Sequence, residues 1–141
     1  MPTKIEHIGI AVKNLDDAEK LYTLLLGTPP YKRETVENEG VVTSFFKVGE
    51  TKIELLAATS PQSAVARFID KRGEGIHHIA FATDDIRKEL KRLKAAGFQI
   101  INETPKPGAD NKWVAFIHPK SVGGVLVELC QDRGKIPDKD A

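Results

Sequence analysis

An internal repeat limits the possible folds of this chain more than any other feature. Residues 5–15, Ile-Glu-His-Ile-Gly-Ile-Ala-Val-Lys-Asn-Leu, resemble residues 76–86. A second similarity links residues 52–56, Lys-Ile-Glu-Leu-Leu, with residues 126–130, Leu-Val-Glu-Leu-Cys. Each copy therefore opens with a histidine in a strand-like segment and closes with a glutamate in another. Two copies of one unit predict a pseudo-twofold arrangement.

The composition is that of one soluble globular domain. The chain has 141 residues, of which 40% are hydrophobic and 29% are charged. A formal net charge of +1 gives no field that would attract nucleic acid. No apolar run approaches the ~20 residues of a membrane span, and the first residues contain no apolar signal region. The single cysteine, Cys130, cannot form an internal disulfide. These features together favour a cytoplasmic location.

The first copy, about residues 4–58, is expected to have the order β-α-β-β-β. Residues 4–12 alternate in polarity, which predicts a strand with His7 opposite its apolar face. Asn14 fits a helix N-cap and Gly27 fits a helix end. Between them, apolar residues recur at helical spacing: Ala18, Leu21, Tyr22 and Leu25. Three further strands are expected, at about residues 31–36, 41–48 and 51–58.

The second copy, about residues 75–130, repeats this order after a connector at 59–74. In the connector, Ser60-Pro61 fits the start of a short helix with apolar residues at Ala64, Phe68 and Ile69. The copy itself is expected to begin with a strand at 76–83, followed by a helix that starts at Asp84 and Asp85 and ends at Gly97. The apolar stripe of this helix is expected to consist of Ile86, Leu90, Leu93 and Ala96. Strands are then expected at about 98–103, 112–118 and 124–130, with a loop at 104–111.

The expected fold class is therefore α+β, with two tandem βαβββ modules in a single domain at residues 1–131. Their strands are expected to form an open eight-stranded mixed sheet around a cleft. Residues 132–141 are polar and are expected to be a C-terminal tail.

Two histidines and two glutamates occupy matching positions of the repeat: His7, His78, Glu54 and Glu128. Each glutamate lies between apolar neighbours in a strand, so its carboxylate must point away from the apolar face. A buried carboxylate is costly unless it is paired or bound to a metal. The His₂Glu₂ set suits Zn, Mn, Co, Ni or Fe(II) and leaves coordination positions for water or substrate. A single histidine or glutamate of this kind is usually solvated or hydrogen-bonded, and the recurrence is what predicts a metal site. His77 falls on the opposite face and is interpreted as structural or exposed.

Several segments resemble a known superfamily. Residues 6–18 resemble the start of a vicinal oxygen chelate (glyoxalase/bleomycin resistance) protein. Residues 76–81, Ile-His-His-Ile-Ala-Phe, and two later segments, Phe-Ile-His-Pro-Lys at 116–120 and Gly-Gly-Val-Leu-Val-Glu-Leu at 123–129, resemble the methylmalonyl-CoA epimerase family within it. The resemblance runs from about residue 4 to 131. It implies paired βαβββ modules, a homodimer, and one divalent metal ion (Co, Mn, Zn or Ni) held by His7, Glu54, His78 and Glu128.

The resemblance also implies a reaction, the interconversion of the (2R) and (2S) forms of methylmalonyl-CoA. The α-proton is removed through a metal-stabilised enolate and returned on the other face. Glu128 is the candidate for one acid/base role, because a ligand carboxylate lies close to a chelated substrate. Some epimerases carry a glutamate just after a Gly-Val-Val run, where this chain has Thr43. Glu37, Glu39, Glu54 and a metal-bound water are the alternatives for the second role.

Lys106, Lys112 and Lys120 are candidates for binding the phosphates of an acyl-CoA substrate. Solvated surface lysines are an equally common interpretation of such residues. No nucleic-acid or membrane partner is expected. Two alternative functions stay open on the same fold: a glyoxalase I-like lactoylglutathione lyase and a metal-free binding module.

Overall fold

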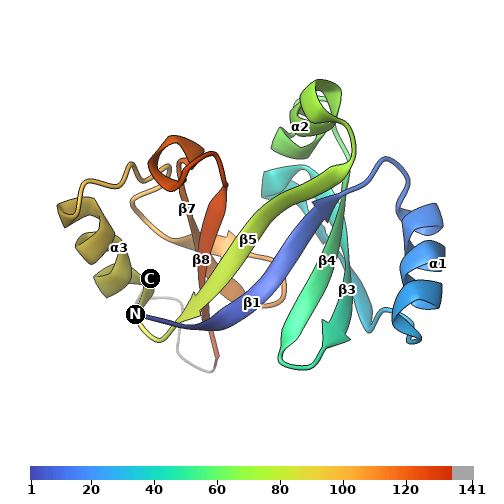
Figure 1. The fold of residues 1–141 in the computed structure, drawn as a ribbon, viewed down its shortest axis with the longest axis horizontal. Coiled ribbons are helices and arrows are strands. Elements are labelled where there is room, and N and C mark those ends of the chain that lie inside the picture. Colours follow the sequence, from blue (N-terminus) through green and yellow to red (C-terminus); the bar gives the residue numbers. More distant parts are fainter. Residues whose placement is uncertain (135–141) are drawn as a thin grey trace. The chain divides into compact units, whose positions relative to one another are not determined.

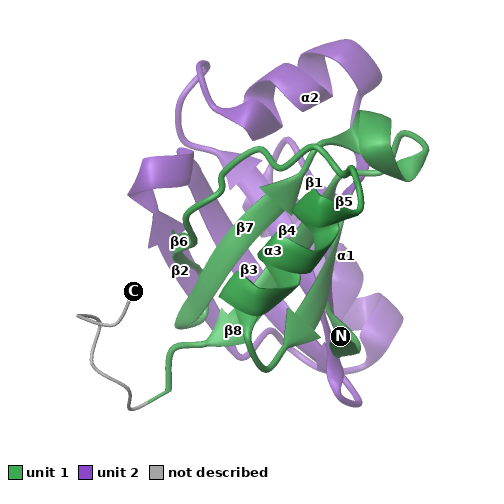
Figure 2. Cartoon of the chain, turned by 90° about the vertical axis from the view of Figure 1, so that its left-hand side faces the viewer, with its two compact units in different colours: residues 1–6, 78–141 green, residues 7–77 purple. Residues whose placement is uncertain are grey.

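The computed structural model describes residues 1–134 of the chain. The described residues form two compact units (Figure 2): unit 1 contains residues 1–6 and 78–134, and unit 2 contains His7–His77. Figure 1 labels most of the helices and strands. They are β1 (Pro2–Ala11), α1 (Leu15–Leu26), β2 (Lys32–Val36), η1 (Glu37–Glu39), β3 (Val41–Val48), β4 (Thr51–Ala58), α2 (Ala64–Arg72), β5 (Gly75–Thr83), α3 (Ile86–Ala95), β6 (Lys106–Gly108), β7 (Lys112–Ile117), η2 (Pro119–Val122) and β8 (Val127–Asp132). No helix within residues 1–134 is long and apolar enough to cross a membrane.

The eight strands follow one hydrogen-bonded order, β2-β3-β4-β1-β5-β8-β7-β6. β1 and β5 each contribute residues to both units. The elements β1-α1-β2-β3-β4 and β5-α3-β6-β7-β8 are two copies of one βαβββ arrangement, with α2 in the connector. This result confirms the predicted fold class. Residues 135–141, most of the expected tail, lie outside the described residues.

In unit 2, one face of the sheet packs against α1 and the other carries polar groups. β1 pairs parallel with β4, and β3 pairs antiparallel with both β2 and β4. The apolar cluster on the α1 side consists of Val12, Leu15, Phe46, Leu55 and Ala57. Because side chains alternate along a strand, Glu54 beside Leu55 points to the opposite face, as the sequence predicts.

Helix α1 begins and ends where the sequence predicts, but its buried stripe is different. The Asn14 side chain accepts a hydrogen bond from the Asp17 amide at 2.9 Å, and Gly27 ends the helix with φ 72°. The expected stripe contained Leu21 and Leu25, yet these side chains are 63% and 69% exposed. The face that packs against the sheet is shifted around the helix and contains Leu15, Ala18, Tyr22 and Leu26.

Helix α2 begins later than expected. The Ser63 hydroxyl accepts a hydrogen bond from the Ala66 amide at 3.1 Å, so Ser63 is the N-cap in place of Ser60-Pro61. Val65 is the buried residue of this helix, whereas Ala64 is exposed. Ser60 instead closes a turn, because its carbonyl accepts a hydrogen bond from the Ser63 amide.

In unit 1, β5 pairs parallel with β8, and β7 pairs antiparallel with β8 and β6. One face of this sheet packs against α3 through Ile86, Leu90, Ala115, Ile117, Val127 and Leu129. The other face carries a smaller apolar cluster of Ala80, Val114 and Cys130, with Phe116 packed beside it. The Asp85 side chain caps α3 by accepting from the Lys88 amide at 3.1 Å, as predicted. Ala96, predicted to be in the stripe, is exposed.

The prediction of a strand at 98–103 is wrong. This segment forms only an isolated bridge between Ile100 and Ile117, and the edge strand is β6, inside the predicted loop. The Asn102 side chain accepts from the Phe116 amide at 2.8 Å and donates to the Val114 carbonyl at 3.3 Å. A side chain thus occupies main-chain groups of β7 that a neighbouring strand would use. β8 also begins three residues later than predicted, because η2 and its following glycines occupy the preceding residues.

Candidate functional site

Unit 2 contains a buried histidine–glutamate pair. His7 and Glu54 are each only 5% exposed, and His7 Nε2 lies 3.6 Å from Glu54 Oε2. Parallel pairing of β1 with β4 brings them together, because Gly9, two residues after His7, is in register with Glu54.

Unit 1 contains an equivalent pair. His78 and Glu128 are 4% and 5% exposed, and His78 Nε2 lies 3.3 Å from Glu128 Oε1. They come from the parallel strands β5 and β8, in which Ala80, two residues after His78, is in register with Glu128. The ring of Phe116, whose backbone is in register with Glu128, contacts the His78 ring edge-on with centroids 6.2 Å apart.

The two pairs are thus one arrangement built twice. In each unit the histidine precedes, by two residues, the residue in register with the glutamate on a parallel strand. The internal repeat therefore reproduces a side-chain geometry as well as a fold. His7, Glu54 and His78 are buried residues of types that hold metal ions.

The donor separations within each pair fit metal ligands. Nitrogen–oxygen distances of 3.3 and 3.6 Å are longer than the ~2.7–3.2 Å of an N–H···O hydrogen bond. Two donors bound at about 2.1 Å to one divalent ion would lie roughly 3.0–3.4 Å apart at octahedral or tetrahedral angles. The 3.3 Å separation of the His78–Glu128 pair lies in this range, and the 3.6 Å separation of the His7–Glu54 pair is slightly longer. Two imidazole nitrogens and two carboxylates are also the ligand types that Zn, Mn, Co and Ni accept. The residues present therefore fit a divalent metal ion.

The three candidate lysines lie in different environments. Lys106 Nζ lies over the ring of Phe116, 5.8 Å from its centroid. Lys112 is 12% exposed, is paired with Asp132, and lies 4.0 Å from a carboxylate oxygen of Glu6. Lys120 is exposed in η2, where its backbone amide donates to Nδ1 of His118 at 3.0 Å.

The candidates for a second acid/base group also differ in burial. Thr43 is buried, and its hydroxyl donates to the carbonyl of Glu34 at 3.2 Å. Glu37 is exposed in η1, and Glu39 is half-buried there. Glu54 is the only one of the three glutamates considered that is buried.

Sequence reasoning missed Phe116, which contacts both His78 and Lys106. Its only sequence signal is the alternation in residues 112–117, which places it on the face opposite Ala115 and Ile117. His77, interpreted as structural, packs its ring edge-on against Phe68 of α2 with centroids 5.0 Å apart.

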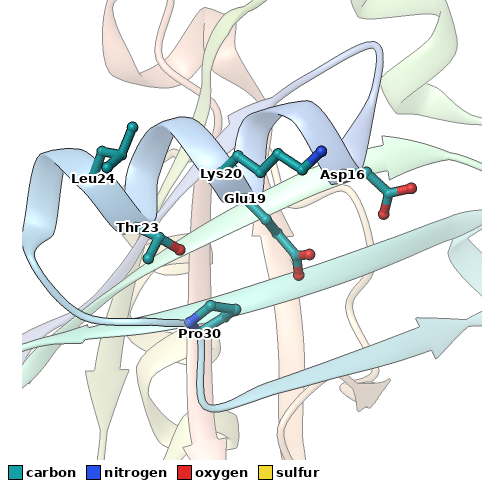
Figure 3. A pocket seen from close by; sticks show the side chains of 6 residues that line it. All are labelled: Asp16, Glu19, Lys20, Thr23, Leu24 and Pro30. Atoms are coloured by element: carbon teal, nitrogen blue, oxygen red, sulfur yellow. The ribbon is translucent and has the colours of Figure 1, made fainter.

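A second group of charged residues in unit 2 anchors a helix. A hollow beside α1 is lined by Asp16, Glu19, Lys20, Thr23, Leu24 and Pro30 (Figure 3). Glu19 points from α1 toward the strands beneath it, where Arg33 and the Ser44 hydroxyl donate hydrogen bonds to its carboxylate. The hydrogen bond from Arg33 holds the pKa of the Glu19 carboxyl below its usual value.

Comparison with known proteins agrees with this architecture. Residues 6–116 match the family model of the glyoxalase/bleomycin resistance protein/dioxygenase superfamily. The mitochondrial methylmalonyl-CoA epimerase of Dictyostelium discoideum is 42% identical over 89% of this chain and 76% of its own length. The ethylmalonyl-CoA/methylmalonyl-CoA epimerase of Cereibacter sphaeroides is 38% identical over 91% of this chain and 97% of its own length.

A solved structure is also closely similar. A variant of Streptomyces coelicolor methylmalonyl-CoA epimerase, in complex with 2-nitronate-propionyl-CoA, superposes with a TM-score of 0.92 at 33% identity, covering 95% of this chain and 97% of that one. The chain therefore belongs to the glyoxalase/bleomycin resistance protein/dioxygenase superfamily and, within it, to the methylmalonyl-CoA epimerase family.

Proposed function

We propose that this protein is a metal-dependent epimerase that interconverts the (2R) and (2S) forms of methylmalonyl-CoA. The observation that carries the proposal is the buried histidine–glutamate pair, built twice in a chain of this family. These four side chains are of types that ligate metals, and burying ionisable groups is costly in a fold that only needs to pack.

We propose that His7, Glu54, His78 and Glu128 together hold one divalent ion, which is Co, Mn, Zn or Ni. Such an ion, when bound, supplies positive charge to the oxygen on which the enolate charge develops. The apolar cluster of Ala80, Val114 and Cys130 shares a sheet face with Phe116. Apolar surroundings strengthen electrostatic interactions.

The protein side chains must remove the α-proton on one face of the substrate α-carbon and deliver a proton on the other face, so one carboxylate acts as base while the protonated carboxyl of the other acts as acid. Glu128 is proposed to take the proton from one epimer, and Glu54 to take it from the other. A carboxylate has two oxygens, so a ligand glutamate retains an oxygen that can accept a proton. Glu54 is favoured over Glu37 and Glu39 because it is buried and is the repeat partner of Glu128. The Thr43 hydroxyl donates to a backbone carbonyl and is a poor proton acceptor at neutral pH.

Proton NMR of methylmalonyl-CoA in D₂O tests the proposal directly. Protein loaded with Co²⁺ or Mn²⁺ is expected to remove the α-proton signal by exchange with solvent deuterium. Protein that demonstrably contains metal but leaves this signal intact would contradict the proposal. Lactoylglutathione formation from a glutathione hemithioacetal is the matched assay for a lyase, and no product is expected.

We also propose that the enzyme works as a homodimer in the cytoplasm. The family resemblance supports the dimer, and the single buried thiol of Cys130 suits a reducing compartment. Sedimentation equilibrium at micromolar protein concentration is expected to give twice the mass of one chain.

A further inference from the structure

Lys106 is held on the same sheet face as the His78–Glu128 pair. β6 pairs with β7 so that Lys106 is in register with Val114, and paired residues of neighbouring strands point to the same face. Val114 belongs to the cluster with Ala80 and Cys130, and Phe116 packs against that cluster. The lysine therefore lies on the face opposite α3.

The backbone of β6 lies close to the side chains of β7. A Cβ atom added to Gly108 would meet Val114 Cγ1 at 2.7 Å, so only glycine allows this approach of β6 to β7. The register that it permits puts Lys106 Nζ over the Phe116 ring, 5.8 Å from the centroid. The same ring contacts His78 edge-on. One aromatic side chain thus contacts both the ammonium group and a proposed metal ligand.

The other lysines are not equivalent. Lys112 is paired with Asp132, and its Nζ lies 4.0 Å from a carboxylate oxygen of Glu6. Lys120 is exposed in η2. Of the three candidates, Lys106 has its ammonium group over the Phe116 ring, and this ring also contacts His78.

We propose that Lys106 binds the free carboxylate of the substrate acyl group and is the residue that selects a carboxylated acyl-CoA. This inference rests on the proposed function, which puts the acyl group at the proposed metal ligands. The phosphates of CoA are separated from that acyl group by the whole pantetheine arm, so a lysine that contacts the same aromatic ring as His78 is poorly placed to reach them. A lysine ammonium on an aromatic face also forms charge-assisted hydrogen bonds with a carboxylate.

A ligand pair that differs only in this group provides the test. Methylmalonyl-CoA and propionyl-CoA differ by one carboxylate, and their dissociation constants can be measured by calorimetry on the metal-loaded protein. The wild type is expected to prefer methylmalonyl-CoA. In Lys106→Met this preference is expected to fall about tenfold or more, with propionyl-CoA binding unchanged within about twofold. Lys106→Arg is expected to keep most of the preference, and Lys91→Met, the control at an exposed lysine of α3, is expected to keep all of it.

Each other outcome has a defined meaning. Equal weakening of both ligands in Lys106→Met would assign the lysine to the CoA portion and overturn the inference, as would an unchanged preference. Retained propionyl-CoA binding shows that the variant is folded. Because the readout is binding, wild type that prefers methylmalonyl-CoA but does not exchange its α-proton would refute the proposed reaction and leave the lysine assignment standing.

Discussion

Glu128 and Glu54 are chemically alike, and each lies beside one histidine of the repeat. The proposed mechanism assigns them to opposite faces of the substrate, so their removal should have opposite effects on the two epimers. The amide of glutamine keeps an oxygen for the metal but cannot accept the proton.

Glu128→Gln is expected to slow α-proton exchange of one epimer by about 10²- to 10⁴-fold and to spare exchange of the other. Glu54→Gln is expected to show the reverse preference. Deuterium incorporation into each separate epimer measures both effects, with metal content determined alongside. Glu103→Gln, at an exposed glutamate paired with Lys94, is the control. Equal loss for both epimers, with metal retained, would refute the two-carboxylate assignment.

Glu89 in α3 stabilises the folded state, and its contribution to the free energy of unfolding depends on pH. Its carboxylate is buried, and hydrogen bonds from Arg92 lower its pKa from 4.5 to about 2, against the opposing effect of burial. A carboxyl with a depressed pKa in the folded state stabilises the fold above its unfolded pKa. That stability is lost as the pH falls from about 4.5 toward 2.

Glu89→Gln is therefore expected to lower the free energy of unfolding at pH 7 by roughly 1–3 kcal/mol. The difference from the wild type should shrink as the pH falls below about 4. Urea unfolding at several pH values measures both effects. A difference that is independent of pH would show that packing, not charge, is the contribution of Glu89.

At the level of elements, α1 is anchored to the sheet of unit 2 by charge as well as by packing. Arg33 of β2 donates hydrogen bonds to both Asp16 and Glu19 of α1, and Ser44 of β3 donates to Glu19. Arg33 and Asp16 are partly exposed, so water and salt screen this network.

Arg33→Met is expected to increase amide hydrogen exchange across residues 15–26 and to lower stability by about 1 kcal/mol. The effect should weaken at high salt. Lys20→Met removes a positive charge from the exposed part of the same helix and serves as the control. Unchanged exchange in α1 would show that its apolar face alone holds the helix in place.

The edge strand β6 depends on Gly108. Gly108→Ala is expected to push β6 away from β7 and to cost about 1–3 kcal/mol of stability, because its Cβ would overlap Val114. The preference for methylmalonyl-CoA over propionyl-CoA should fall with it. Adding Val114→Ala removes the clashing methyl groups and should restore that preference. A Gly108→Ala protein with normal stability and preference would contradict this account.

At the level of the whole molecule, the central question is how many ions one chain binds. If His7, Glu54, His78 and Glu128 share one ion, the metal content should be one per chain. His7→Ala and His78→Ala should then each lose that same ion, and each should abolish the increase in melting temperature that metal gives.

Metal analysis after dialysis, with melting curves before and after a chelator, measures these outcomes. The control is His118→Ala, because His118 caps η2 with its ring nitrogen. Two ions per chain, with one lost in each histidine variant, would mean that each unit holds its own metal and would contradict the shared site.

Much of the candidate site could be predicted because the evidence for it is local or repeated. Alternation in residues 4–12 and 76–83 indicated which face each histidine shares, and the apolar neighbours of Glu54 and Glu128 indicated where the carboxylates point. Helix caps at Asn14 and Asp85 follow from short-range hydrogen bonds of their own side chains. Such features need no knowledge of distant partners.

The errors share a different physical cause. The strand expected at 98–103 is absent because the Asn102 side chain bonds to the backbone of β7, a partner far along the chain. Leu21 and Leu25 are exposed because the orientation of α1 is set by contacts with β3 and β4, and helical spacing alone allows more than one stripe.

By itself, the sequence determined the two βαβββ modules, the caps and the four candidate metal ligands, because periodicity, capping and internal repetition act over short distances. Only the tertiary structure decided which lysine contacts the same aromatic ring as a histidine of the repeat. Lys106, Lys112 and Lys120 look alike in the sequence, and strand register separates them: it places one over Phe116 and pairs another with Asp132. Register is a long-range property, since a strand's neighbours are chosen by the pairing of the whole sheet.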